Sequence, residues 1–340
     1  MKKINFIFLI SSLIILSSCK KEYTFNRGFT QGTTYAITYQ SVKGTDYHEE
    51  IKQLLEDFDF SLSTYNDSSV ISKINRNESN HADEHFTYVY HLSKEIAART
   101  DTAFDITIGP LVNAFGFGPD GAIAIDSAVV DSILDFTGYD KFTLQDGSIQ
   151  KLDPRVKVDM NAIAQGYSVD LVAGLLEDKG IKNYLVEIGG EVRARGLNPK
   201  GKTWRIGIDK PMEGNNNPGQ NLQAIIQLKD KALATSGNYR KFYEKDGVKY
   251  AHIIDPQTGY PALRRMLSAT VITDKCIEAD ALATSFMVMG LEKTKKFLEE
   301  NTGIQAYLIY SDKEGNYQVY STEKIKGMIT EIESSPKTNH

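Results

Sequence analysis

The fold is decided around residues 278–285, which read Glu278-Ala279-Asp280-Ala281-Leu282-Ala283-Thr284-Ser285. This alanine-rich stretch predicts a helix over residues 279–289, and a second helical pattern covers residues 291–299. Asp280 and Thr284 lie four residues apart, so their side chains share one side of the first helix. Their hard oxygen atoms suit Mg²⁺. From the residues alone, capping or back-bonding within the helix is the alternative.

Helical and strand patterns are interspersed along the rest of the chain. Apolar residues at helical spacing predict helices over residues 46–60, 86–100 and 168–179. Short alternating or apolar runs predict strands over residues 34–40, 184–188, 191–196, 204–208, 222–228, 250–254, 267–273 and 305–310. No regular βαβ rhythm is present, so we expect one α+β domain instead of a doubly wound parallel sheet.

The N-terminus has the pattern of a bacterial lipoprotein signal. Two lysines precede an apolar run over residues 4–16, which is too short to span a bilayer as a mature helix. The run ends in Leu-Ser-Ser-Cys at residues 16–19, which resembles a lipobox. We expect removal of residues 1–18, lipidation of Cys19 and a tether over residues 19–27. An ordinary signal peptide with an incidental cysteine is the alternative.

Composition places the mature chain among acidic globular proteins. The formal charge is −5, and 41% of the residues are hydrophobic. Removal of the signal would change the charge to −7, because both lysines are lost. An acidic chain lacks the basic surface that nucleic acids require. We expect one body over residues 28–327 and a polar tail over residues 328–340, with Cys276 as a small buried hydrophobe.

Several segments contain more glycine, acidic and aromatic residues than packing requires. Residues 103–110 read Ala-Phe-Asp-Ile-Thr-Ile-Gly-Pro, which suggests a loop against a ligand, although a strand ending in a turn is the alternative. Residues 158–170 place small residues before a helix, an arrangement that accepts phosphates or ligates cations. The pair Gly189-Gly190 permits close approach of a ligand, but a double glycine between strands is more often a turn.

Together and in this order, the segments resemble the ApbE family of FAD:protein FMN transferases. The resemblance covers about residues 29–290 and is carried by Gly32-Thr33, residues 61–65, 104–118 and 159–170, Gly189-Gly190, and residues 235–240, 252–261 and 279–284. It implies a single T-fold-like flavin transferase domain of mixed sheets and packed helices. It also implies a lipoprotein that binds FAD with Mg²⁺, cleaves the pyrophosphate, places FMN on a protein threonine through a phosphoester and releases AMP.

The resemblance also implies roles for single residues. Asp280 and Thr284 match side-chain ligands of Mg²⁺, and Ala162 matches a ligand that offers its backbone carbonyl. The positions that match the FAD site are Tyr65, Ala103, Phe104, Asp105, Asp159, Gln165 and His252. Gln165 stands where many relatives have lysine. Glutamine keeps a hydrogen-bond donor near the diphosphate but supplies no positive charge.

A threonine hydroxyl is a weak nucleophile, so a base must help to remove its proton. His252 and Asp255 are both candidates, and the sequence does not choose between them. If water replaced threonine, the same site would be an FAD pyrophosphatase. A non-enzymatic flavin-binding lipoprotein is the alternative from another class. As partners we expect flavinylated redox-pump subunits or extracytoplasmic reductases, with the chain anchored by its lipid on the extracytoplasmic, periplasmic side of a bacterial membrane.

Overall fold

The computed structural model describes residues 21–119, 121–212, 215, 219–238, 242–245, 248–251, 253–262 and 265–332. Within these residues, eight strands form one antiparallel sheet in the order β1-β2-β5-β6-β9-β12-β13-β14. The strands are β1 (Lys21–Thr30), β2 (Thr33–Val42), β5 (Tyr184–Ile188), β6 (Glu191–Arg195), β9 (Lys231–Gly237), β12 (Met266–Thr273), β13 (Gln305–Ser311) and β14 (Tyr317–Ser321). The antiparallel pairing confirms the expected α+β class.

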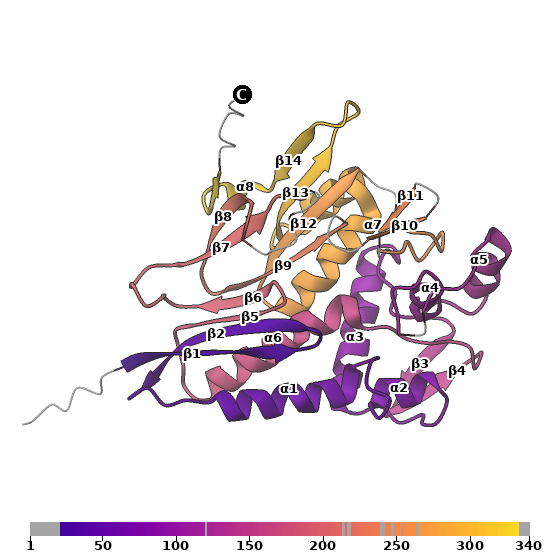
Figure 1. Ribbon diagram of the computed structural model, residues 1–340, viewed down its shortest axis with the longest axis horizontal. Coiled ribbons are helices and arrows are strands. Elements are labelled where there is room, and N and C mark those ends of the chain that lie inside the picture. Colours follow the sequence, from indigo (N-terminus) through magenta and orange to yellow (C-terminus); the bar gives the residue numbers. More distant parts are fainter. Residues whose placement is uncertain are drawn as a thin grey trace, which may run out of the picture.

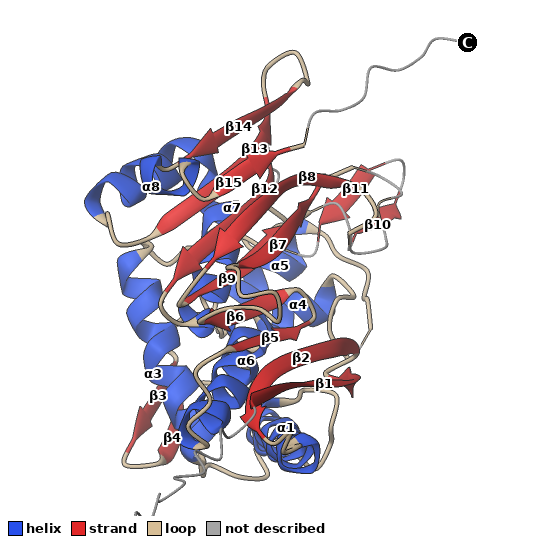
Figure 2. Cartoon of the chain, turned by 90° about the vertical axis from the view of Figure 1, so that its left-hand side faces the viewer, coloured by secondary structure: helices blue, strands red, loops and turns tan. Residues whose placement is uncertain are grey.

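Helices cover one face of this sheet (Figures 1 and 2). The long ones are α1 (His48–Leu62), α3 (Glu84–Arg99), α6 (Asn161–Asp178) and α7 (Cys276–Glu300). The short ones are α2 (Val70–Asn75), α4 (Gly109–Ala114) and α5 (Ser127–Leu134), whereas α8 (Glu323–Lys326) packs on the opposite face through Ile325. Helix α6 packs on β5 and β6, and α7 packs on β9 and β12. Their apolar faces form the core with the inward side chains of the sheet.

Smaller sheets complete the fold. Strands β7 (Trp204–Asp209), β8 (Leu222–Leu228) and β15 (Ile329–Glu331) pair with one another and pack on the opposite face of the large sheet. Two hairpins lie elsewhere, β3 (Phe142–Gln145) with β4 (Ser148–Lys151) and β10 (Phe242–Lys245) with β11 (Val248–Ala251). Across the described residues, no helix combines the length and hydropathy that crossing a membrane requires.

The structure corrects the expected termini of the body. Residues 21–27, expected in the tether, belong to β1, which pairs with β2 along its whole length from Lys21 to Thr30. Residues 329–331, expected in the tail, form β15 and pair with β8. Both segments are polar enough to resemble loops because only part of each strand is buried. Residues 1–20, including the expected signal and Cys19, lie outside the described residues.

The two helical patterns near the C-terminus are confirmed. Gly290 has a φ of 73° and interrupts α7 between them. Cys276 is fully buried, as expected of a small hydrophobe. The expected strand over residues 250–254 is displaced: β11 ends at residue 251, and Ile254 makes only an isolated bridge to Pro261.

Helices α6 and α7 are in close contact at Gly166. A Cβ added there would lie 2.5 Å from the Cys276 carbonyl oxygen and 2.8 Å from the Asp280 Cβ. Both distances are shorter than real Cβ contacts, so only glycine permits this approach. Gly174, two turns further along α6, has no such neighbour within 4 Å.

We predict that Gly166→Ala lowers the free energy of unfolding by about 1–3 kcal/mol, because overpacking forces the two helices apart. Gly174→Ala is the matched control in the same helix and should raise it by roughly 0.5–1 kcal/mol. Urea unfolding monitored by circular dichroism measures both. Equal stability of the two variants would contradict a close contact at residue 166.

Candidate functional site

The contact between α6 and α7 buries one carboxylate. Asp280 is 6% exposed, and its Oδ2 accepts a hydrogen bond from the Gly166 backbone N–H at 2.9 Å. In an α-helix the N–H of residue 166 also faces the carbonyl of residue 162. The Asp280 carboxylate keeps lone-pair capacity for a further partner. Its hydrogen bond to the Gly166 N–H joins Asp280 to the first turns of α6, the helix that also contains Ala162.

Burial raises the pKa of Asp280 to about 7, against the lowering effect of the Gly166 hydrogen bond. A cation beside such a carboxylate would favour its ionised form. One turn further along α7, Thr284 Oγ1 lies 3.0 Å from Ser236 Oγ on β9. The third predicted ligand thus lies where α7 meets β9, on the helix that also carries Asp280 toward α6.

The start of α7 is held by a pair that the sequence pattern does not reveal. Asp170 on α6 accepts hydrogen bonds from the backbone N–H groups of Cys276 and Ile277, both at 3.0 Å. Arg193 Nη1 on β6 donates to the same carboxylate at 2.9 Å. A carboxylate at a helix N-terminus is favourable. The sequence feature that could have indicated this contact is the spacing of Gly166 and Asp170, which lie one turn apart and share a helix face.

Gln165 lies against the turn between β5 and β6. Its Nε2 donates to the Ile188 carbonyl at 3.0 Å. A Cβ at Gly189 would lie 1.6 Å from that nitrogen, and φ at this residue is 63°. The Gly189 N–H in turn donates to the Thr34 carbonyl of β2 at 3.0 Å. The double glycine is therefore both a hairpin turn and the contact surface for the Gln165 amide.

Asp159 and Tyr65 are neighbours at the entry to α6. The Asp159 carboxylate accepts hydrogen bonds from the Asn161 N–H at 2.8 Å and from Asn161 Nδ2 at 3.2 Å, while burial raises its pKa. The pKa of the Tyr65 phenol is raised, mainly by partial burial and secondly by the charge of Asp159. The Tyr65 residue is nevertheless 67% exposed, and its hydroxyl donates to the Phe117 carbonyl at 3.4 Å. Its ring thus borders the segment over residues 104–118.

The three predicted FAD contacts at residues 103–105 have buried side chains. Ala103 and Phe104 belong to the main hydrophobic core. Asp105 Oδ1 accepts hydrogen bonds from the Thr107 N–H and hydroxyl, both at 2.7 Å, and burial raises the pKa of this carboxyl to about 6. These side chains fold the loop, so its backbone is the part that remains for a ligand.

One of the two candidate bases, Asp255, lies in the segment that follows β11. Asp255 is buried, and its Oδ1 accepts a hydrogen bond from the Gln257 N–H at 3.0 Å. Its backbone N–H donates to the Tyr260 carbonyl at 2.9 Å, which closes the Asp-Pro-x-Thr-Gly turn. His252 lies outside the described residues. The choice between the two bases stays open.

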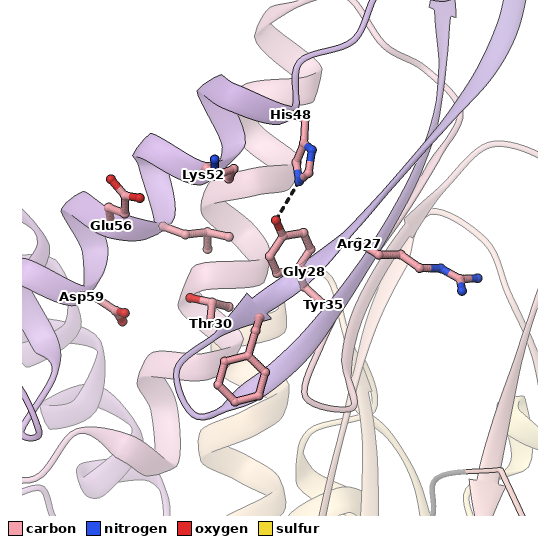
Figure 3. Close-up of a pocket in the computed structure, with 10 residues that line it drawn as sticks. Arg27, Gly28, Thr30, Tyr35, His48, Lys52, Glu56 and Asp59 are labelled. Atoms are coloured by element: carbon pink, nitrogen blue, oxygen red, sulfur yellow. Dashed lines mark hydrogen bonds between the residues drawn. The ribbon is translucent and has the colours of Figure 1, made fainter.

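A groove of about 350 Å³ lies between β1 and α1 (Figure 3). Tyr35 from β2 and His48 from α1 meet in it, with 2.8 Å between the hydroxyl oxygen and Nε2. Lys52, Glu56 and Asp59 also line it from α1. None of the predicted Mg²⁺ or FAD ligands contributes to its lining. The groove is thus a feature apart from the contact between α6 and α7.

Comparison with known proteins identifies relatives over nearly the whole chain. The family model described as the ApbE family matches residues 31–308. The FAD:protein FMN transferase of Vibrio cholerae is 38% identical, with 96% of this chain and 99% of the relative covered. The FAD:protein FMN transferase of Escherichia coli K12 is 35% identical, with 91% of this chain and 90% of the relative covered.

Solved structures with these names have the same fold. The flavin transferase ApbE from Vibrio cholerae matches with a TM-score of 0.80 and 37% identity, covering 91% of this chain and all of the other. The apo form of the Pseudomonas stutzeri flavinyl transferase ApbE matches with a TM-score of 0.80 and 32% identity, covering 91% of this chain and 97% of the other. These likenesses confirm the expected fold.

The raised pKa of Asp280 predicts a pH-dependent stability. An unfolded aspartate has a pKa near 4, so between about pH 4 and pH 7 the native state holds a proton that the unfolded state has lost. The free energy of unfolding should therefore fall as the pH rises through this window and level off above it. Asp280→Asn should show a smaller decline, because other buried carboxyls such as Asp105 still titrate in this window, while it keeps an acceptor for the Gly166 N–H.

The measurement is urea unfolding in chelator between pH 4 and pH 8, for wild type and Asp280→Asn. The stability advantage of the variant should grow with pH by roughly 1.4 kcal/mol for each unit that separates the two pKa values. Asp274→Asn is the control. It removes an exposed carboxylate just before α7 and should show no such trend. An advantage of Asp280→Asn that does not change with pH would contradict the prediction.

Proposed function

The chain belongs to the ApbE family, and on this premise we propose that it transfers FMN from FAD to a threonine hydroxyl of an acceptor protein, forming a phosphoester and releasing AMP. Relatives that match almost its full length are named for this transfer. The observation that carries the proposal is the buried Asp280 carboxylate, which the Gly166 N–H holds beside the first turns of α6.

The oxygen atoms at this contact fit Mg²⁺. Asp280 offers one carboxylate, while Thr284 offers a hydroxyl and Ala162 a carbonyl. Mg²⁺ is usually held by one or two carboxylates and completes its shell with water and substrate phosphates. Bound there, the ion would offset the negative charge of the diphosphate that is cleaved. The net charge of −5 makes local positive charge and local hydrogen-bond donors necessary for an anionic substrate.

FAD would lie against the residues around the start of α6. The exposed ring of Tyr65 is open to stacking by an aromatic ligand. Asp159 precedes the helix, and Gln165 directs its amide to the double-glycine turn. The loop over residues 103–105 would contribute backbone groups, because its side chains are buried. These contacts would position the diphosphate without a lysine at residue 165.

The transfer requires that the threonine oxygen attacks the FMN phosphorus while the bond to the AMP oxygen breaks. AMP leaves with the bridging oxygen, and the hydroxyl proton must pass to a base. We propose that His252 or Asp255 accepts it.

The transfer is proposed to occur at a membrane surface. Cleavage after residue 18 and lipidation of Cys19 would anchor the chain on the extracytoplasmic side, because the lipobox-like sequence directs that modification. Acceptors in redox pumps or extracytoplasmic reductases would be reached there. The first described residue of β1, Lys21, would then follow the lipid-bearing cysteine closely.

A single assay tests the proposed transfer. The chain is incubated with FAD, Mg²⁺ and an acceptor protein that carries a threonine of the kind that becomes flavinylated. Release of AMP and protein-bound flavin fluorescence are then followed. We expect both products. Replacing Mg²⁺ by chelator, or Asp280 by alanine, should lower the rate more than about 100-fold, since loss of a metal ligand exceeds the effect of losing its supporting hydrogen bonds. Glu292→Gln, an exposed carboxylate on the same helix, is the control and should retain the rate.

The assay also separates the alternative functions. AMP with free FMN would identify an FAD pyrophosphatase, and FAD bound without any product would identify a flavin-binding lipoprotein. Full activity of Asp280→Ala would overturn the proposed ligand set even if transfer occurs.

Gln165 provides a test of how the diphosphate is recognised. Gln165→Lys restores a cation, and an opposite charge about 4 Å away in a water-like environment is worth about 1 kcal/mol, or roughly a fivefold lower KM for FAD. Salt should weaken this gain. Gln165→Met is the control of similar length without a donor, and it should raise KM. If lysine and methionine gave the same KM at low salt, residue 165 would not face the diphosphate.

A further inference from the structure

Strand β1 presents exposed aromatic side chains at the edge of the large sheet. In the described part of the chain it pairs with β2 alone. Phe25 is 62% exposed and Phe29 is 71% exposed, and Arg27 between them is also exposed. Strand side chains alternate between two faces, so these three share one face, which we call the β1 face. Arg27 and Phe29 also border the groove between β1 and α1. Figure 3 shows Arg27 directed away from α1.

The opposite face of the hairpin has its partners within the fold. Asn26 is buried and donates to Asp46 Oδ1 at 2.9 Å, and Tyr35 meets His48 from α1. The β1 face continues across β2 through uncharged residues. Its cross-strand pairs are Phe25 with Thr38, Arg27 with Ala36, and Phe29 with Thr34. A long edge strand with two exposed phenylalanines invites association unless something covers it.

The position of the proposed lipid anchor indicates what covers it. Cys19 lies two residues before the start of β1 and six before Phe25. An extended chain spans at most about 3.6 Å per residue, so Phe25 lies within roughly 22 Å of the lipid-bearing cysteine. If β1 stood upright on the membrane, Phe29 would be about 13 Å further away than Phe25. Both aromatic side chains reach the bilayer only if the strand lies flat.

We propose that the β1 face lies on the bilayer that holds the acylated Cys19. This inference rests on the lipid anchor of the proposed function. Aromatic side chains are favourable at the boundary between headgroups and acyl chains. Arg27 between them would contact anionic headgroups. Lipid and strand together form a two-part attachment, which binds more firmly than either part alone.

The β1–β2 hairpin also contacts the candidate site. The far end of the β1–β2 hairpin reaches the double-glycine turn, where the Gly189 N–H donates to the Thr34 carbonyl at 3.0 Å. There Ser168 Oγ on α6 lies 3.4 Å from Gln31 Oε1. These contacts connect the hairpin that carries the β1 face to the residues around Gln165.

The test uses the full chain with its native N-terminus, reconstituted in vesicles that contain anionic lipid and lipid with a nitroxide near the headgroup. Phe29→Cys is labelled with a thiol-reactive fluorophore. Tyr317→Cys is the matched control, because Tyr317 is 56% exposed on β14 at the other edge of the sheet. Cys276 is fully buried and should not react, and Cys19 would be blocked by its lipid.

We expect the nitroxide lipid to quench the label at residue 29 several-fold more than the label at residue 317, and mass spectrometry to find acyl chains on Cys19. Equal quenching at the two positions overturns the proposal. Protection of residue 29 from aqueous iodide without quenching by lipid also overturns it, because a protein strand or a second copy would then cover β1. Unmodified Cys19 removes its premise and overturns it as well. FMN transfer by the same variants in detergent tests the proposed function separately.

Discussion

The close approach of α6 and α7 at Gly166 is the constraint on which the candidate site depends. The contact between the two helices buries Asp280, and the Gly166 N–H supplies the hydrogen bond that makes this burial tolerable. The same N–H belongs to the first turns of α6, which also contain Ala162. Without this approach, Asp280 would be an ordinary solvated residue with no reason to bind a cation.

Other contacts maintain this approach. The Asp170 carboxylate receives the first N–H groups of α7 and is itself paired with Arg193 from the sheet, so α6, α7 and β6 are joined at one point. Gln165 on the same helix binds the turn between β5 and β6. Helix α6 is therefore fixed at two points, and the oxygen atoms that we assign to Mg²⁺ are held before any ligand arrives.

Local sequence patterns predicted much of this structure. The break at Gly290, the helical spacing of Asp280 and Thr284, and the turn at the double glycine all depend on neighbours in the chain. The pairing of Asp170 with Arg193 could not be predicted, because it joins residues that only the fold brings together. The assignment of residues 21–27 to a tether failed for a related reason: an edge strand with one exposed face contains as many polar residues as a loop. Burial of the side chains at residues 103–105 likewise depends on packing against distant helices.

The central claim is that the contact between α6 and α7 holds a divalent cation for work on a diphosphate. The most direct measurement is anomalous diffraction from crystals soaked with Mn²⁺ and FAD, since Mn²⁺ takes oxygen ligands as Mg²⁺ does. We predict one peak at about 2.1 Å from oxygen atoms of Asp280, Thr284 and Ala162. A peak that contacts none of these three oxygens, or FAD bound in the site with no metal beside it, would contradict the account.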